Sequence, residues 1–450
     1  MSNENLAVDS ARTHLLENDP WDHLPDILNR ISAPSFASIE YSLVDFGAHP
    51  DGATDCTDAF RKAIGACHMA GGGRVIVPPG DWLTGAIRLK TGVELHVTEG
   101  ATIKFKRAPQ AYLPLVHTRW EGTEVFNYSP FIYAMNESNI AITGKGFLDG
   151  QADGLHWWSW DKIIRGKGEE SARKLLHEMN DTGVSLSERV FGEGSYLRPN
   201  LITFFRCRDI LIEDVTLLRS PMWHLHPLES ENVTVRRLTI ESSGPNTDGC
   251  NPESCKNVLI EGCNFNTGND CIAIKSGRNS DGRRLNIPSQ NIVIRGCRMK
   301  GGHGAITLGS EITGGVRNVF VENCFMGSAT LRSAIRVKNN SIRGGLLEKL
   351  YCRRIFVDEV CTSILEMDFN YEEGGAGNFI PCARTVQISQ LVANRCTRIA
   401  DVQGAQNGSI SNVKMKDCYI SNVAELHRIE CGSIIQLENV FVDGAYVHAL

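Results

Sequence analysis

Short runs of alternating apolar and polar residues recur along most of the chain. In each run an Asn or Asp is followed by alternating apolar residues rich in Val and Ile, and the run ends in a short polar turn. Six of these runs are SNIAITG from Ser138, RDILIED from Arg208, ENVTVRR from Glu231, KNVLIEG from Lys256, QNIVIRG from Gln290 and RNVFVEN from Arg317. Alternation of this length predicts a β-strand with one buried face.

The spacing of these runs predicts how the strands are arranged. After one gap of 70 residues, the anchoring residues are separated by 23, 25, 34 and 27 residues. Shorter apolar stretches lie between them, which leaves no room for crossover helices of ordinary length. We therefore predict an all-β fold in which each turn of the chain carries several short strands and stacks on the next, a parallel β-solenoid. The alternative is a β-propeller, for which a repeat of roughly 40 residues would be expected.

The anchoring residues themselves form a second pattern. Amide side chains at equivalent turns can stack as an internal ladder that satisfies their hydrogen bonds. We expect such a ladder at the anchoring positions, which are Asn139, Asp209, Asn232, Asn257, Asn291 and Asn318.

Two regions interrupt the repeat. Residues 1–40 are polar, and we predict that they form a helical lead-in and an N-terminal cap, followed by a single β-helix domain over 41–450. Residues 151–200 form a long insertion with a helical middle, and insertions of this length are usually functional. The insertion begins with Trp157, Trp158 and Trp160, which are expected either to line a sugar-binding cleft or to form the core of the insertion.

Composition narrows the classes of function. Of the 450 residues, 42% are hydrophobic and 22% are charged, which predicts a large core and excludes a disordered chain. The net charge is −6 with dispersed Lys and Arg, so we expect no nucleic-acid partner. No run of 18 apolar residues is present, which excludes a spanning helix and gives no sign of a membrane partner.

The cysteines indicate the redox compartment. The 15 cysteines form no CxxC pair and recur at the same place in EGCNF, RGCRM, VENCFM and KDCYI. This placement predicts small buried thiols in stacked strands, as expected in a reducing compartment. The N-terminus has no basic region followed by an apolar one, so we expect no signal peptide and a cytoplasmic location.

Candidate catalytic side chains occur in four successive turns of the predicted solenoid. These turns are GPNTDGCNP with Asn246 and Asp248, TGNDCIAIKSG with Asn269 and Asp270, GGHGAIT with His303, and AIRVKNN with Arg336 and Lys338. Because stacked strands lie about 4.8 Å apart, equivalent positions in neighbouring turns should be close. We therefore expect Asp248 and Asn269, which are 21 residues apart, to be spatial neighbours.

Carboxylates beside a histidine and two cations suit the hydrolysis of an anionic glycoside. One carboxyl group must protonate the leaving oxygen while another carboxylate activates water, and a separation of roughly 6.5 to 9.5 Å leaves room for that water. Arg336 and Lys338 alternate along one strand and should point the same way. There they can bind a sugar carboxylate, the Arg as a bidentate fork.

These four motifs, in this order, resemble the polygalacturonase family, glycoside hydrolase family 28. The family signatures are Asn-Thr-Asp, Asp-Asp, Gly-His-Gly and Arg-Ile-Lys, and Val337 replaces the usual Ile here. The segments from Asp45 to Val97 are also similar to the opening of pectin-active β-helix proteins. RPNLITFFRC and SPMWHLHP are similar to segments of bacterial exo-acting members. The resemblance covers roughly residues 40 to 440.

The resemblance implies a right-handed parallel β-helix and inverting hydrolysis of α-1,4-galacturonosyl bonds in pectin-derived oligogalacturonate, without a metal or other cofactor. By the same resemblance, Asp248 and Asp270 match the carboxylates that activate water, and His303 matches the histidine that supports hydrogen bonding and protonation. The implied substrate-binding residues are Asn246, Arg336, Lys338 and, by a weaker match in FNYEEGG, Tyr371.

Asn269 departs from the family pattern, because members carry there the Asp that acts as general acid. An amide has no titratable proton to give, so we expect a loss of about 10²- to 10⁴-fold in rate. Asn is nearly isosteric with Asp, so substrate binding should survive. The two explanations are a substitution introduced to trap substrate and a natural homologue with weakened or altered chemistry. The surrounding motifs, which fit an active enzyme, favour the first.

The sequence is compatible with two modes of action and with several alternative functions. If the insertion closes one end of the cleft, the enzyme attacks chain ends, and we expect exo rather than endo action. The alternatives are a glycosidase for rhamnogalacturonan or another uronate polymer, a β-helix lyase, and a catalytically weak or inactive solenoid that binds uronate oligosaccharides. Neither the exact substrate nor the oligomeric state follows from the sequence.

Overall fold

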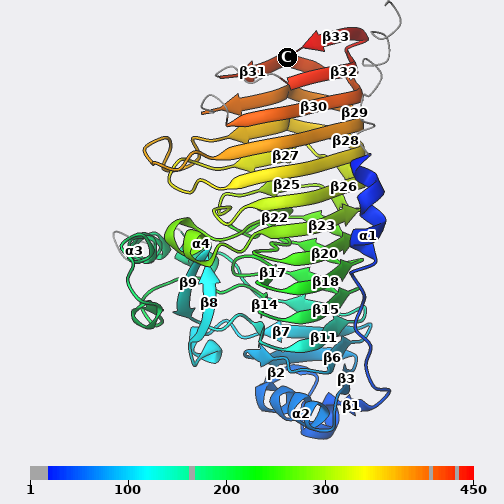
Figure 1. Ribbon diagram of the computed structural model, residues 1–450. Helices are drawn as coiled ribbons and strands as arrows, with labels where there is room; N and C mark the ends of the chain where they lie inside the picture. Colours follow the sequence, from blue (N-terminus) through cyan, green and yellow to red (C-terminus); the bar gives the residue numbers. More distant parts are fainter. Residues whose placement is uncertain (1–18, 162–167, 405–408, 431–434, 450) are drawn as a thin grey trace, which may run out of the picture.

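The computed structural model describes residues 19–161, 168–404, 409–430 and 435–449. The chain winds into stacked coils that rise from the N-terminal end to the C-terminal end (Figure 1). Nearly all strand pairs between coils are parallel, which makes the fold the right-handed parallel β-helix that the sequence predicts. The coils present three walls, and the core is the column of side chains between them. No helix in the described part of the chain is long and apolar enough to cross a membrane.

The first wall carries the repeated Asn and Asp positions. Strands β26, β28, β29, β30 and β32 are long and bend from this wall into the next. The strands are β1 Glu40–Ser42, β3 Gly73–Val77, β6 Val93–Val97, β11 Ser138–Thr143, β15 Arg208–Glu213, β18 Glu231–Arg236, β20 Lys256–Glu261, β23 Ser289–Arg295, β26 Val316–Met326, β28 Leu346–Asp368, β29 Cys382–Gln403, β30 Ile410–Ile420, β32 Ile435–Val442 and the antiparallel β33 Ala445–Ala449.

The second wall is made of shorter strands and the bent ends of the long ones. These strands are β2 Asp51–Asp55, β4 Gly80–Thr84, β7 Ala101–Phe105, β12 Phe147–Asp149, β16 Thr216–Leu218, β19 Thr239–Glu241, β21 Asn264–Asn266 and β24 Arg298–Met299.

The third wall carries the candidate site. Two single bridges, Leu225 to Cys250 and Cys250 to Ile272, continue it past the coil that lacks a regular strand. The later parts of β28 and β29 complete it. Its strands are β5 Ile87–Arg88, β10 Ile132–Met135, β14 Ile202–Phe205, β17 Leu225–Leu228, β22 Ile272–Ile274, β25 Gly304–Leu308, β27 Ser333–Lys338 and β31 Val423–Ile429.

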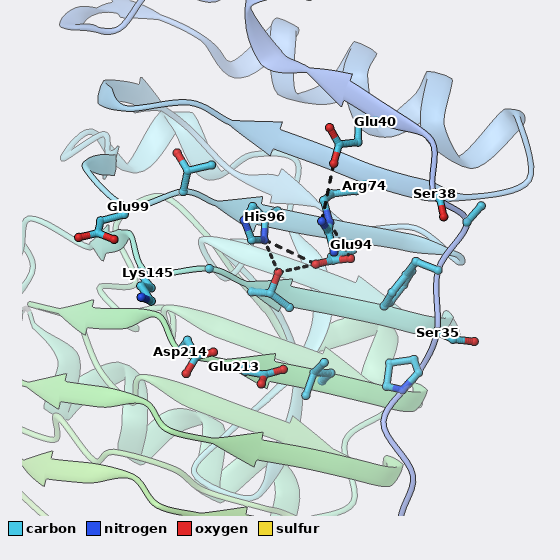
Figure 2. A pocket seen from close by; sticks show the side chains of 17 residues that line it. Ser35, Ser38, Glu40, Arg74, Glu94, His96, Glu99, Lys145, Glu213 and Asp214 are labelled. Carbon is cyan, nitrogen blue, oxygen red and sulfur yellow. Dashed lines mark hydrogen bonds and ion pairs between the residues drawn. The ribbon is translucent and has the colours of Figure 1, made fainter.

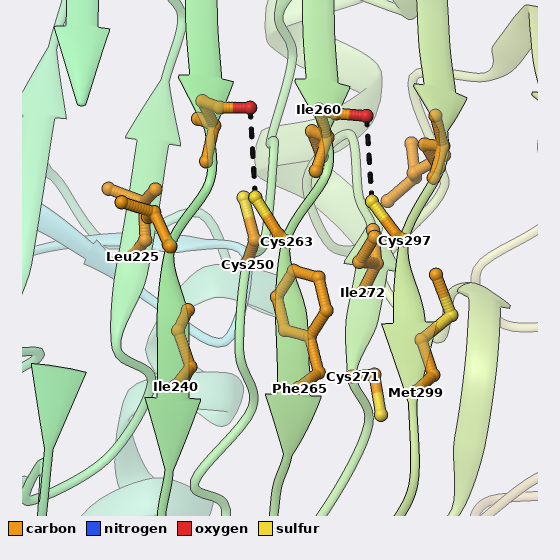
Figure 3. Packing of buried hydrophobic residues seen from close by; sticks show 14 of the residues in the cluster. Leu225, Ile240, Cys250, Ile260, Cys263, Phe265, Cys271, Ile272, Cys297 and Met299 are labelled. Carbon is orange, nitrogen blue, oxygen red and sulfur yellow. Dashed lines mark hydrogen bonds between the residues drawn. The ribbon is translucent and has the colours of Figure 1, made fainter. Parts of the chain in front are cut away.

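Inward side chains stack in register from coil to coil. Ile260, Ile294 and Val321 are paired neighbours on successive strands and are completely buried. Cys263 and Cys297 occupy a similar column beside Phe265 and Met299 (Figure 3). The thiols predicted to be buried, including Cys324 and Cys418, are free and buried.

The repeated Asn and Asp residues have a backbone reason as well as a side-chain one. All six have φ between 55° and 58°, the left-handed region that Asn and Asp tolerate better than other residues with a Cβ. The predicted ladder is present in two parts: Asn232 donates to Asp209 at 2.5 Å, and Asn318 and Asn291 continue a second part that begins at Asn257, with bonds of 3.1 and 3.0 Å. The ladder is interrupted at Asn257, which donates to Glu231, and it does not include Asn139, which donates to the carbonyl of Ser35.

The segment before β1 runs along the outer face of the first wall. It contains η1 Pro20–His23 and α1 Leu24–Leu28, and Trp21 packs edge-on against Phe320. The N-terminal end of the coils is covered by α2 Thr57–Met69 (Figure 1), while residues 1–18 of the expected lead-in lie outside the described residues. Two further short 3-10 helices are η2 Leu43–Phe46 and η3 Pro109–Tyr112.

A pocket of about 710 Å³ opens where residues 34–38 cross the first wall. Figure 2 shows a chain of contacts that joins Glu40, Arg74, Glu94 and His96 within this pocket. Thr143 donates to Glu94 and lies 2.7 Å from His96 Nδ1, while Arg74 pairs with Glu94 at 3.0 Å. These contacts belong to the first wall, away from the predicted catalytic residues.

The insertion, together with two strands that precede it and one helix that follows it in the chain, forms a lobe beside the third wall (Figure 1). Trp120, Leu176, Phe191 and Trp223 are among the residues that form its small core. The lobe's elements are β8 Val116–Trp120, β9 Thr123–Asn127, η4 Trp158–Trp160, α3 Glu169–Asp181, η5 Leu186–Glu188, β13 Val190–Phe191 and α4 Asn279–Leu285.

The insertion's first tryptophans pack inward instead of lining a cleft. Trp157 is 1% exposed and belongs to the main core, where it contacts Tyr112 and Trp160. Trp158 donates its indole N–H to the carbonyl of Ser220 at 2.9 Å. The three tryptophans thus pack in or against the main core, which is neither the sugar-binding cleft nor the core of the insertion that was expected from the sequence.

Candidate active site

The predicted site residues lie at equivalent places in successive coils of the third wall. Asn269 and Asp270 precede β22, and His303 precedes β25. Gly302 must be glycine, since its φ is 101° and a Cβ there would lie 1.7 Å from the carbonyl oxygen of Asn269. The Gly-His-Gly motif therefore allows two coils to approach closely at the site.

Asp248 and Asn269 are direct neighbours, as the spacing predicted. Asn269 Nδ2 donates to Asp248 Oδ1 at 2.6 Å, and Asn251 Nδ2 donates to the other oxygen at 2.8 Å. Asp248 is only 1% exposed, whereas Asn269 is half-buried and faces the pocket described below. An amide thus occupies the place where a second carboxyl group would touch Asp248.

Asp270 is held by the cations of β27. Lys338 Nζ lies 2.7 Å from Asp270 Oδ2, and Arg336 Nη1 lies 4.0 Å from Oδ1. Asp270 is completely buried, and its Oδ1 has no hydrogen-bond partner among the described residues. A buried acceptor without a partner is unfavourable unless a ligand or water fills the place, so Oδ1 is a natural acceptor for a water proton.

The two carboxyl groups differ in their protonation. Burial, followed by the negative charge of Asp270, raises the pKa of Asp248 to about 6. Burial alone would raise the pKa of Asp270 as well, but the charges of Lys338 and Arg336 outweigh it and lower that pKa to about 2. Between these values Asp270 is ionised while Asp248 retains its proton, and above pH 6 both are ionised.

Arg336 also has a partner that the sequence did not reveal. Its Nε donates to Glu366 Oε1 at 3.2 Å, and Glu366 is the register partner of Arg336 on β28. Tyr371 follows β28, with its ring centre 5.7 Å from the Arg336 guanidinium and 5.3 Å from Lys338 Nζ. The three predicted substrate-binding residues of this part of the site are therefore close together.

His303 lies on the other side of the row. It is partly exposed and borders a groove of about 650 Å³ that also contains Arg219 and Glu241. Its backbone N–H donates to the carbonyl of Asn269 at 2.9 Å. Partial burial, followed by the repulsion of Arg336, lowers the pKa of His303 despite the opposing effect of Asp270, which favours the neutral imidazole.

A pocket of about 300 Å³ lies on the insertion side of the row. Its lining is strongly polar and comes from the third wall, the insertion and the segment after β28. The lining residues are Glu121, Asp161, Glu169, Glu170, Arg173, Trp223, Asn246, Asp248, Asn269, Lys275, Ser310, Glu311, Lys338, Tyr371 and Glu372.

Ion pairs between distant segments form part of the lining of this pocket. Arg173 of α3 pairs with Glu121 at 2.6 Å and with Glu372 at 2.7 Å, and Arg343 pairs with Glu372 at 2.7 Å. Lys275 is buried and contacts Glu311 at 2.6 Å. Sequence reasoning missed these residues, although the KSG after β22 offered a signal for Lys275, because a lysine ending a buried strand needs a partner.

Comparison with known proteins identifies the family. The model of glycosyl hydrolases family 28 matches residues 193–431. A probable polygalacturonase from Vitis vinifera is 30% identical over 414 residues, which cover 88% of this chain and 77% of that protein. The crystal structure of a hyperthermoactive exopolygalacturonase from Thermotoga maritima is 41% identical, with a TM-score of 0.92 over 95% of this chain and 97% of that one.

A second solved structure supports the fold alone. The family 28 exopolygalacturonase of Yersinia enterocolitica is 20% identical, with a TM-score of 0.67 over 91% of this chain and 79% of that chain. Together with the row of side chains on the third wall, the family model and the relatives lead to one conclusion. The chain belongs to glycosyl hydrolase family 28 and is a polygalacturonase-like glycoside hydrolase.

Proposed function

We propose that this chain hydrolyses α-1,4-galacturonosyl bonds from the end of pectin-derived oligogalacturonates, with inversion, and that Asn269 slows the reaction. The observation that carries the proposal is the pairing of Asp270 with Lys338 and Arg336 directly beside the Asp248–Asn269 contact. The exo-acting Thermotoga relative adds support.

The geometry supports the water-activating half of the reaction. Asp270 is ionised over the whole ordinary pH range because Lys338 and Arg336 lower its pKa. Its unpartnered Oδ1 can take a proton from water as the water oxygen attacks the anomeric carbon. The bond from that carbon to the leaving sugar oxygen then breaks, and this oxygen needs a proton.

Asn269 removes the expected source of that proton. A carboxyl group at position 269 would lie against Asp248 Oδ1, where Asn269 Nδ2 now lies at 2.6 Å. Two carboxyl groups so close do not both ionise, so one of them would keep a proton for the leaving group. The amide, whether natural or introduced, has no such proton, and we expect turnover about 10²- to 10⁴-fold below that of the carboxylate.

The pocket supports exo action. Arg173 of the insertion pairs with Glu121 and Glu372 at the end of the pocket, which limits the sugar that can extend beyond the row. The groove beside His303 is larger and leaves room for the rest of a chain. A terminal galacturonate would thus occupy the pocket, with the leaving chain in the groove.

The test compares the native chain with Asn269→Asp on a series of oligogalacturonates. We expect new reducing ends, galacturonate as the first product, and a gain of about 10²- to 10⁴-fold in rate for Asn269→Asp. Ultraviolet absorbance from a new double bond would indicate a lyase and contradict the proposal. Binding without hydrolysis by either protein would favour a uronate-binding β-helix.

The place of action is also part of the proposal. Twelve of the 14 free cysteines in the described residues are buried, as in Cys263 and Cys297. Such thiols suit a reducing compartment, so we propose that the chain acts in the cytoplasm on oligosaccharides taken into the cell.

A further inference from the structure

Arg198 is a buried cation that contacts the loop leading into Asp248, called the catalytic loop below, and it has no place in the mechanism above. It lies between β13 and β14, is completely buried, and does not line the pocket. A buried guanidinium is costly unless each of its N–H groups has a partner. The identity of its partners therefore shows what this arginine holds in place.

All five side-chain N–H groups of Arg198 have acceptors. Nε and one N–H of Nη2 form a bidentate pair with the carboxylate of Glu169. Nη1 donates to the carbonyls of Pro221 at 3.0 Å and Pro245 at 2.8 Å. The second N–H of Nη2 donates to Asn246 Oδ1 at 2.9 Å. The planar fork is fully used, which a lysine could not reproduce.

These acceptors join two parts of the site. Glu169 is the first residue of α3 and lines the pocket from the insertion. Pro245 and Asn246 belong to the loop that leads into Asp248. The start of the same loop is fixed by the insertion too, because Trp158 lies so close to Gly244 that a Cβ there would be 2.1 Å from the indole.

The bond to Asn246 also determines what that residue presents to substrate. Asn246 lines the pocket with a φ of 53°, a backbone conformation that is uncommon for residues with a Cβ. Since Arg198 holds Oδ1, the amide orientation is fixed, and Nδ2 has no hydrogen-bond partner among the described residues. Two N–H donors are thus available in the pocket for a sugar oxygen.

We propose that Arg198 is a positioning residue that couples the insertion to the catalytic loop, so that Asn246 presents Nδ2 to the terminal sugar and Asp248 keeps its place. This inference rests on the proposed function of the site. It goes further in assigning the orientation of Asn246, and hence terminal-sugar binding, to a residue that does not touch the substrate.

The experiment is a double-mutant cycle in the chain that carries Asn269→Asp. The variants are Arg198→Lys, Asn246→Ala and the two combined, and Arg119→Lys is the control. Arg119 is equally buried and pairs with Glu253 at 3.0 Å, but none of its contacts reaches the catalytic loop. The measurements are kcat and KM on trigalacturonate and the melting temperature of each variant.

We expect Arg198→Lys to lower kcat/KM by about 100-fold, as misplacement by about 1 Å can do. The combined variant should be no worse than the more damaging single change, because Arg198 acts through Asn246. Arg119→Lys should lose melting temperature but keep activity within about twofold. Losses that multiply in the combined variant, or an Arg198→Lys enzyme within about twofold of its parent, would overturn the inference.

Two further measurements cover the cases in which Arg198→Lys does not fold or the parent does not hydrolyse trigalacturonate. If Arg198→Lys does not fold, Glu169→Gln weakens the same fork, and its effect should likewise fail to add to that of Asn246→Ala. If the parent binds trigalacturonate without hydrolysing it, the cycle is repeated on Kd, where the same coupling is expected. A parent that neither binds nor hydrolyses galacturonates would refute the proposed function itself, and this inference with it.

Discussion

On the first wall of the β-helix the same side chain returns in coil after coil, whereas on the third wall each coil carries a different one. Asn257, Asn291 and Asn318 repeat one conformation and one hydrogen bond. Asp248 and Asp270, by contrast, have pKa values shifted in opposite directions, because burial and then Asp270 raise that of Asp248, whereas Lys338 and Arg336 outweigh burial at Asp270. In this fold the repeated residues have structural roles, and the candidate catalytic residues lie where neighbouring coils differ.

The pockets on the first and third walls also differ from each other. The pocket on the first wall has about 710 Å³ and the pocket on the third wall about 300 Å³, so size alone would indicate the wrong site. In the larger pocket Glu94 is matched by Arg74 and Thr143. The smaller one is lined by Asp248, Asn269 and Lys338, which contact one another or Asp270. The chemistry of the lining is therefore a better indicator of function here than its volume.

The largest expected effect comes from comparing one change of carboxylate to amide on the third wall with the same change on the first wall. In the chain carrying Asn269→Asp, Asp270→Asn should reduce kcat by about 10²- to 10⁴-fold, because the acceptor for the water proton is lost. The matched change on the first wall is Asp209→Asn, which should leave kcat within about twofold. Initial rates on oligogalacturonate measure both. Equal losses in the two variants would remove the distinction between the walls.

The next effect concerns the cation that keeps Asp270 ionised. Lys338→Met should lower kcat/KM by about 10- to 100-fold at neutral pH, the loss typical of a hydrogen bond to a charged group. Asp270 must be ionised to accept a proton, and loss of Lys338 raises its pKa. The acid side of the pH profile of kcat/KM should therefore move to higher pH.

Lys338→Arg is the control for that change, since it keeps the positive charge beside Asp270. Its pH profile should follow that of the parent more closely than the profile of Lys338→Met. If the acid limb stays in place when the charge is removed, Lys338 does not control the ionisation of Asp270.

A smaller effect is expected in the first-wall pocket, and on stability alone. Burial opposes ionisation of Glu94, but hydrogen bonds from His96 and Thr143 and the charge of Arg74 lower its pKa to about 2. A group whose pKa is lower in the folded than in the unfolded state stabilises the fold at pH values above its unfolded pKa. This stabilisation is lost as the pH falls toward the folded-state pKa. Glu94→Gln should therefore destabilise the fold by about 1–3 kcal/mol at pH 7.

Urea unfolding at a series of pH values checks this prediction. The difference between the native chain and Glu94→Gln should shrink as pH falls from 4.5 toward 2. Glu99→Gln, an exposed change in the same pocket, should show no such difference. Any effect of Glu94→Gln on hydrolysis would mean that the two walls are functionally linked.

The smallest expected effect concerns the Asn ladder, where two variants separate the contribution of the amide hydrogen bonds from that of the backbone conformation. Asn291→Ala loses the amide bonds and places a Cβ residue at a φ of 57°, whereas Asn291→Gly loses only the amide. Alanine should cost about 1–2 kcal/mol more than glycine in the free energy of unfolding. Thermal or urea unfolding of both variants measures the difference, and activity should not change. A glycine variant as unstable as alanine would mean that the amide matters and the backbone conformation does not.

Much of this architecture follows from the sequence because the interactions that make it are local and repeated. The alternation after Asn257 and Asn291 predicted strands, and the ladder followed from their spacing. The motif order placed Asp248 beside Asn269, as the 2.6 Å contact confirms. The roles of these side chains in catalysis remain predictions.

The lobe and the pocket lining could not be predicted in the same way. Trp157 is in the main core because its neighbours come from residues 112 and 131, and an aromatic residue carries no local sign of which face it will join. Glu121, Arg173 and Glu372 meet through ion pairs between segments with no shared period. Such contacts depend on where loops end in space, which spacing along the chain does not encode.

The ion pair between Arg173 and Glu372 has a consequence for the order of folding. Its partners are 199 residues apart, while most contacts of the coils join neighbours in the stack. Coils can therefore form one after another as the chain leaves the ribosome, but the pocket stays unfinished until residues beyond 372 have been made. The pocket is completed late in synthesis, so a nascent or truncated chain would have the stacked coils without the completed pocket.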